Sequence, residues 1–133
     1  MKAYLKNYRQ TPRKVRIIGN LVKGKSVAQA LGELTFLVKR GSEPLKKLLE
    51  SAVANAKNND GIEAKDLFIK SVTVNGGMVM KRVERKARGA SNVIHKRSSN
   101  ITVELTTNKE TDNKKQVTSN KEEKKISKVN SKK

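Results

Sequence analysis

The sequence contains no cysteine and no tryptophan, and aromatic residues make up only 3 % of the chain. Without cysteine, a disulfide framework and a zinc ribbon or knuckle are excluded. The only histidine, His95, cannot by itself build a metal site or a Ser-His catalytic unit. Because aromatic side chains are scarce, the chain also offers few of the stacking platforms that proteins binding single-stranded nucleic acid use.

The sequence also has few acidic residues and no long apolar run. No run of 18 apolar residues exists, and the first ten residues lack the apolar stretch of a secretory signal. We therefore expect a soluble protein with no membrane partner that stays where it is made. The 133 residues suit one domain, and 31 Lys and Arg against 12 acids give a net charge of +19. A charge this one-sided implies a polyanionic partner, nucleic acid before an anionic membrane surface.

The positive charge is concentrated in three segments. Residues 1–25 carry eight basic residues and no acid, and residues 81–97 carry seven basic residues and one acid. Residues 26–77 are almost neutral, with seven basic and six acidic residues. The last segment, 107–133, has nine lysines against four acids. This distribution indicates a neutral core with two basic binding elements and a basic tail.

The first basic segment contains a predicted helix that starts at Thr11-Pro12, a hydroxyl N-cap followed by proline, and that Gly24 closes. Its mid-helix glycine, Gly19, indicates close packing against a neighbour. On a helical wheel the apolar residues share one arc, which we expect to face the core: Val15, Ile17, Ile18, Leu21 and Val22. The opposite arc carries Arg13, Arg16, Asn20 and Lys23.

Two further helices are predicted in the neutral segment. Ser26 caps the first of them, which ends at 39–41, and Ser42 caps the second, which stops at 58–61. The second has a clear apolar stripe of Leu45, Leu48, Leu49, Ala52, Val53 and Ala56.

After residue 61 the hydrophobic period changes from about 3.6 to 2. Strands are predicted over 67–74 and 101–105, with a third over 3–9. The predicted fold class is α+β, with three helices packed on one face of a small three-stranded antiparallel sheet. Residues 1–106 form the expected domain, and the Lys-rich residues 107–133 are expected to be a disordered tail because they contain few apolar side chains.

The segment KRVERKARGASNVIHKR, residues 81–97, lies between the second and third predicted strands. The simplest connection is a long extended basic hairpin over 78–100, with a bend or bulge at Gly76-Gly77 and a turn near Gly89. Arms of about ten residues would reach roughly 33 Å. A two-stranded hairpin of this length is only marginally stable alone, which favours a polyanion that holds it. The alternative is a mobile basic surface loop with no defined role.

Three stretches resemble a known family: TPRKVRIIGNLVKGKSVAQAL, SAVANAKNNDG and KRVERKARGASNVIHKRSSNIT. Their content and order are similar to those of bacterial large-subunit ribosomal protein number twenty-two, and the resemblance covers about residues 3–106. It implies three helices on a three-stranded sheet with a long hairpin. It also implies a structural protein of the large ribosomal subunit in the cytoplasm, with the globular part on large-subunit ribosomal RNA. The hairpin tip would line the polypeptide exit tunnel, next to the nascent polypeptide, and the protein would support subunit assembly and touch neighbouring ribosomal proteins.

The resemblance and the basic clusters together select the candidate RNA-binding residues. They are Arg9, Thr11, Arg13, Lys14, Arg16, Lys23, Gly24, Lys25, Lys81, Arg82, Arg85, Lys86, Arg88, Gly89, Lys96, Arg97 and Asn100. The expected tunnel-facing tip is Arg88, Gly89, Ala90 and Ser91. Asn100 could equally be a residue that ends a strand. Glu84 and Ala90 depart from the family pattern, and Glu84 would repel phosphate unless Arg82 or Lys86 pairs with it.

Other functions have weaker support from the residues. No nucleophile and base can be nominated as a pair, so we expect neither an enzyme nor a cofactor. A DNA architectural protein is the main rival, because such proteins also use basic β-arms. Their arms commonly carry an apolar wedge at the tip, where this chain has Gly-Ala-Ser. We also expect no exposed apolar helix face that could form a dimer, and hence no DNA partner.

Overall fold

The computed structural model describes residues 1–107, so the predicted tail lies outside the described residues except for Thr107. The elements follow in the order β1 (Lys2–Tyr8), α1 (Pro12–Val22), α2 (Val27–Phe36), α3 (Ser42–Asp60), β2 (Leu67–Arg85) and β3 (Ser91–Thr107). Short 3-10 turns at Ala64–Asp66 and Ala87–Gly89 complete them. The predicted α+β class is confirmed. Within the described residues, no helix is long and apolar enough to cross a membrane.

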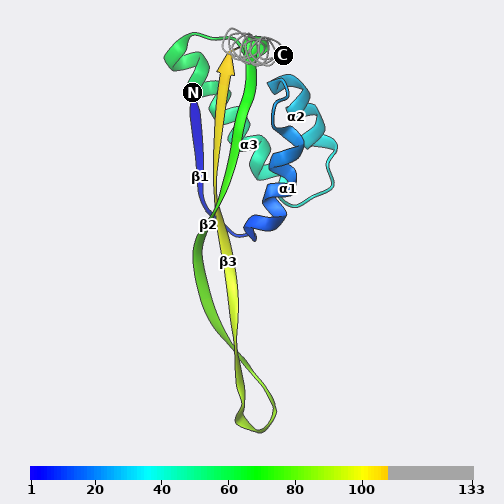
Figure 1. Cartoon of the computed structure of the whole chain (residues 1–133), viewed down its shortest axis with the longest axis vertical. Helices are drawn as coiled ribbons and strands as arrows, with labels where there is room; N and C mark the ends of the chain where they lie inside the picture. The colour runs from blue at the N-terminus through cyan, green and yellow to red at the C-terminus, as the bar shows by residue number, and fades with distance from the viewer. Residues whose placement is uncertain (108–133) are drawn as a thin grey trace, which may run out of the picture.

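The sheet is antiparallel, with the strand order β1-β3-β2, so the last strand lies in the centre (Figure 1). The register places Ala3 and Val72 on either side of Val103, and Ile101 beside Val74. A shift in the register between Ile69 and Ser71 moves the buried side of β2 from odd to even positions. This bulge explains why β2 does not keep a strict alternation of buried and exposed residues.

The helices cover one face of the sheet (Figure 1). α1 packs mainly on β2, α3 packs on β1 and β3, and α2 packs largely against α3. Gly19 lets α1 approach the sheet closely, because a Cβ at this position would lie 3.1 Å from Cγ1 of Val72. The close packing predicted for Gly19 is therefore confirmed. The core contains the predicted stripe of α3, with Leu45, Leu49, Ala52 and Ala56 fully buried.

Two helix boundaries differ from the prediction. α2 ends at Phe36 rather than at 39–41. Ser42 is the first residue of α3 and not its cap, and Gly41 takes the cap position. The single hydrogen of the Ser42 hydroxyl is shared between the carbonyls of Leu37 and Lys39, which lie 3.0 and 2.6 Å from Oγ. The side chain thus holds the preceding loop in place, and it accepts no hydrogen bond from a backbone amide.

The apolar arc predicted for α1 is too wide. Val15, Ile18 and Val22 are buried, but Ile17 and Leu21 keep 67 % and 40 % of their surface exposed. Only residues spaced three and four apart along one line face the sheet, and Ile17 and Leu21 lie on its flank. The expectation that no apolar helix face is exposed was therefore wrong.

β2 and β3 continue beyond the sheet as a two-stranded arm, as predicted (Figure 1). Their pairing runs from Val79↔Arg97 to Arg85↔Ser91, and every residue from 81 to 97 is exposed. The register shifts between Gly76 and Val79, which confirms the predicted bulge at the root. The turn is also where it was predicted, with Arg88 and Gly89 both at positive φ, +57° and +77°.

Candidate nucleic-acid interface

A hollow of about 570 Å³ lies where the start of α1 meets the root of the hairpin. It is lined by Thr11, Pro12, Arg13, Lys14, Arg16, Gly76 and Arg97. None of these lining residues is acidic. Four cations from two elements far apart in the sequence therefore face one space, and the amino-terminal end of the α1 dipole adds positive potential to it.

Arg16 has a second role in this hollow. Its Nε donates a hydrogen bond of 3.0 Å to the carbonyl of Val74, which joins α1 to β2. An arginine has five donor hydrogens, so this bond leaves the terminal nitrogens of the guanidinium to meet an anion. Thr11 begins the helix as predicted, although its hydroxyl makes no capping hydrogen bond.

Three other predicted residues, Lys23, Gly24 and Lys25, lie at the opposite end of α1, about 16 Å away along the helix axis. Lys23 and Gly24 are exposed, and the backbone of the loop pairs with β2 through Gly24 N–H to the Ile69 carbonyl at 2.9 Å. Lys25 forms an ion pair with Glu33, with 2.7 Å to Oε2. The structure thus separates these residues from the hollow and gives Lys25 a carboxylate partner. Arg9 is exposed between β1 and α1 and does not line the hollow.

Residues paired across two antiparallel strands lie on the same face, so the hairpin has two faces. These two faces differ in charge. Pairs Lys81↔His95, Val83↔Val93 and Arg85↔Ser91 define a first face, which Val79↔Arg97 extends to the root. Pairs Met80↔Lys96, Arg82↔Ile94 and Glu84↔Asn92 define the second face. The first face contains cations and no carboxylate among its paired residues, whereas the second contains Glu84.

Arg97 belongs both to the first face and to the hollow. The two surfaces are therefore continuous, and together they bring Arg13, Lys14, Arg16, Arg97, Lys81 and Arg85 onto one cationic path. On the second face, Glu84 pairs with Lys86 at 3.0 Å. This is one of the two pairings that the sequence suggested would keep its charge from repelling a phosphate.

At the tip, a single turn reverses the chain. The Lys86 amide donates to the Ala90 carbonyl at 2.9 Å, and the Ala90 amide donates to the Ala87 carbonyl at 3.3 Å. Arg88, Gly89, Ala90 and Ser91 are all exposed. The tip is narrow because its side chains, apart from Arg88, are small.

Asn100 has a structural role at the root. Its Oδ1 accepts a hydrogen bond of 2.8 Å from the backbone amide of Asn7, which sits at a positive φ of 55°. Next to it, the Ser98 hydroxyl donates to the Met78 carbonyl at 2.7 Å. The sequence did not predict these two hydrogen bonds, and it did not predict that Gly76 lines the hollow. Only the Gly-Gly pair signalled that the chain is unusual here.

The sequence matches the family described as "Ribosomal protein L22p/L17e" over residues 3–106. It is 46 % identical over 102 residues to the large ribosomal subunit protein uL22 of Mesoplasma florum, a match that covers 77 % of this chain and 91 % of the relative. The uL22 protein of Mycoplasmopsis agalactiae is 44 % identical over 104 residues, covering 78 % and 91 %. That of Herpetosiphon aurantiacus is 43 % identical over 102 residues, covering 77 % and 90 %. The predicted resemblance is confirmed, and the chain belongs to the ribosomal protein L22p/L17e family.

Proposed function

We propose that this protein is a structural, non-enzymatic component of the large ribosomal subunit in the cytoplasm, and that it binds large-subunit ribosomal RNA. The observation that carries the proposal is the continuous cationic path from the hollow at α1 along the first face of the hairpin. Lys and Arg side chains on such a path neutralise phosphates where RNA strands converge. Membership of the L22p/L17e family supports the same conclusion.

Recognition of this kind depends on charge and shape. The major groove of double-stranded RNA is too deep and narrow for side chains to read, so proteins recognise the duplex mainly through phosphates and 2′-hydroxyls. The exposed cations of the hairpin suit this mode, and the hairpin projects from the globular part to where RNA can surround it (Figure 1). The narrow tip of Arg88, Gly89, Ala90 and Ser91 would then line the exit tunnel beside the nascent polypeptide, and the bound protein would support subunit assembly. The other subunit proteins would be its neighbours.

The salt dependence of affinity tests the proposal. The full chain is titrated with purified large-subunit ribosomal RNA at several salt concentrations. If about eight phosphates are contacted, the log-log slope should be about −6 to −7. A slope near −2 would mean that the basic residues are mainly solvated.

A matched pair of double variants locates the contact. Arg13→Gln with Arg97→Gln removes two cations from the hollow, and Lys57→Gln with Lys65→Gln removes two exposed cations elsewhere. Only the first pair should reduce the slope, by about 0.7–0.9 for each lost contact. Equal effects would mean that net charge alone attracts the RNA. Duplex DNA of equal length serves as the competing ligand, and tighter binding to it would favour the DNA architectural alternative.

Sedimentation tests the location directly. The chain should travel with the large ribosomal subunit in a sucrose gradient at moderately high salt, and treatment with RNase but not DNase should release it. Recovery with chromosomal DNA, or as a free small species, would contradict the proposal.

A further inference from the structure

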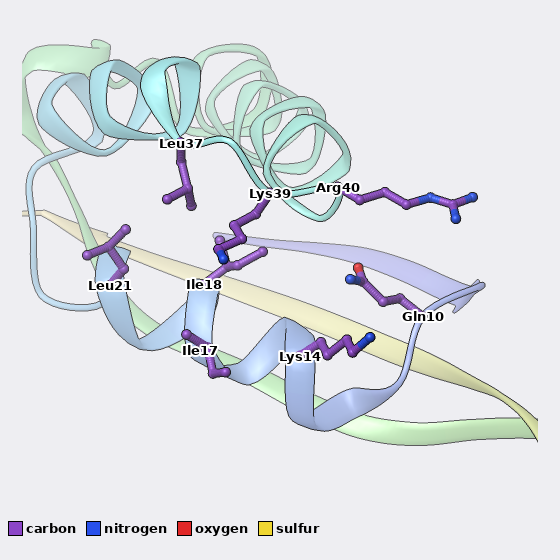
Figure 2. Close-up of a pocket in the computed structure, with 8 residues that line it drawn as sticks. All are labelled: Gln10, Lys14, Ile17, Ile18, Leu21, Leu37, Lys39 and Arg40. Carbon is purple, nitrogen blue, oxygen red and sulfur yellow. The ribbon is translucent and has the colours of Figure 1, made fainter.

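A second concave surface lies between α1 and the segment that joins α2 to α3 (Figure 2). This groove has a volume of about 570 Å³. It is lined by Gln10, Lys14, Ile17, Ile18, Leu21, Leu37, Lys39 and Arg40. Apart from Lys14, it shares no residue with the basic hollow, so RNA binding in the hollow does not account for it.

The floor of the groove is aliphatic and open to solvent. Ile17 is 67 % exposed and Leu21 is 40 % exposed, and Leu37 stands across from Leu21 (Figure 2). Two neighbours of Leu37 in the sequence, Phe36 and Val38, are almost fully exposed. Scattered apolar residues are ordinary on a protein surface, but a concave aliphatic surface with a polar rim is typical of an interaction site.

The charged residues of the groove are all cations. Lys14, Lys39 and Arg40 line it together with the uncharged Gln10, and none of the lining residues is acidic. The ion pairs within the described part of the chain involve none of these three cations. An occupant that complements this site therefore combines aliphatic side chains with carboxylates at their flanks.

We infer that the groove docks a segment of another protein, in which two or three aliphatic residues are flanked by Asp or Glu. A second copy of this chain is a poor occupant, because each copy carries a net charge of +19. A nucleotide base is also a poor match, because bases stack on aromatic side chains and the lining residues include none. The segment 107–133 is rich in lysine, so its charge has the same sign as the rim.

The first test measures binding in solution. The probe is a short fluorescent helical peptide with leucines on one face and glutamates at both flanks, and it is titrated with the full chain. Leu21→Ser keeps the charge of the protein and should weaken binding by about tenfold, because the leucine surface is no longer buried. The control Phe36→Ser removes an exposed aromatic side chain that does not line the groove. The affinity of this variant for the peptide should equal that of the wild type. Equal affinity for Leu21→Ser and the wild type would overturn the inference, since charge alone would then explain binding.

The second test asks what occupies the groove in cells. A photo-crosslinking amino acid replaces Ile17 in the full chain, and the crosslinked peptides are identified by mass spectrometry. A crosslink to a segment of another protein with aliphatic and acidic residues is expected, and Lys39→Glu with Arg40→Glu should abolish it. Crosslinks only to RNA, to a second copy or to residues 107–133, or no crosslink at all, would overturn the inference.

Docking of a protein segment in the groove goes beyond RNA binding, and either property can be absent while the other is present. Leu21→Ser should leave the affinity for ribosomal RNA and its salt slope unchanged, because this side chain does not line the hollow. A variant that loses both activities would instead point to a folding defect, which its urea unfolding curve would show. In that case Ile17→Ser, at a more exposed position of the same floor, replaces it in the peptide titration.

Discussion

Gly77 lies at the point where the hairpin leaves the sheet, and it has no room for a side chain. A Cβ there would lie 2.6 Å from Oγ of Ser98 and 3.1 Å from Oδ1 of Asn100. Both side chains are engaged, since Ser98 donates to the Met78 carbonyl and Asn100 accepts from Asn7. We therefore expect Gly77→Ala to lower the free energy of unfolding by about 1–3 kcal/mol, measured by urea denaturation.

The adjacent glycine provides the control for this prediction. A Cβ on Gly76 would meet no atom within 4 Å, and its backbone is not in the left-handed region. Gly76→Ala should therefore change the free energy of unfolding by less than about 0.5 kcal/mol. If both variants behave alike, the crowding at Gly77 does not constrain the root.

The ion pair between Lys2 and Glu104, 2.7 Å apart, should make the stability depend on pH. The hydrogen bond from Lys2, with another from Ser71, lowers the pKa of the Glu104 carboxyl below its ordinary value. A lowered folded-state pKa stabilises the fold above the pKa of an unfolded glutamate, about 4.3, and this contribution is lost as pH falls through the lower folded value.

The corresponding variant is Glu104→Gln. Its urea midpoint should lie below that of the wild type at pH 7, and the difference should shrink as the pH falls below about 4.3. The same hydrogen bond raises the pKa of Lys2, so the stabilisation should also fade at very alkaline pH. A difference between the two proteins that stays constant from pH 7 to pH 3 would mean that the pair does not contribute through its charge.

Some residue-level predictions from the sequence were wrong because one sequence pattern is compatible with two different local structures. Ser42 follows a glycine and precedes a helix, which suits an N-cap, yet its hydroxyl instead holds the carbonyls of the loop before it. Ile17 and Leu21 fit the apolar arc of α1, but which flank of a helix meets the sheet depends on the crossing of the two elements. A single sequence does not contain that information.

At the scale of single elements, the hairpin offers a direct comparison between neighbouring cations. Lys81 lies on the first face and Arg82 on the second, where its guanidinium donates to the Lys81 carbonyl. We expect Lys81→Gln to reduce the salt slope of RNA binding by about 0.7–0.9, and Arg82→Gln to leave it nearly unchanged. Because both substitutions remove one charge, equal slopes would mean that the RNA does not distinguish the two faces.

The tip can be removed without disturbing the rest of the strand pairing. Replacing residues 85–91 by Asn-Gly keeps the pair Glu84↔Asn92 and supplies a tight turn. Since every replaced residue is exposed, the urea midpoint should stay within experimental error, and the chain should still enter the large subunit. Crosslinks from a nascent polypeptide to this protein should be lost.

The same replacement can fail in two recognisable ways. If the shortened chain is folded but absent from large subunits, the tip is needed for assembly and the globular contacts are insufficient. If nascent-chain crosslinks persist, the tip does not line the tunnel.

The elements themselves were largely predictable from the sequence. Thr11-Pro12 marked the start of α1, Gly61 marked the end of α3, and the change of period marked the sheet and its basic extension. The bulge after Ile69 and the kink at Asn7 were not predictable, because both depend on how β3 pairs with strands distant in the sequence. For the same reason the sequence grouped the basic residues of α1 together, whereas the fold divides them between the hollow and the far loop.

At the scale of the whole molecule, the net charge of +19 should make salt act in opposite directions on folding and on binding. Salt screens the repulsion between like charges, so the urea midpoint of the free protein should rise with ionic strength. RNA affinity should fall over the same range, because releasing counterions into a more concentrated salt solution gains less free energy. A midpoint that falls with salt would mean that the few ion pairs stabilise the fold more than repulsion weakens it.

The central position of β3 has a consequence for the order of events during synthesis. β1 emerges from the ribosome early, yet its hydrogen-bonding partner is the last of the three strands of the sheet to be made. The sheet therefore cannot close until residues near 105 have been translated. Until then, α1 and the first arm of the hairpin cannot pack in the completed fold. These two segments carry most of the cations of the path. An RNA that is itself still folding can meet these segments before the sheet is complete.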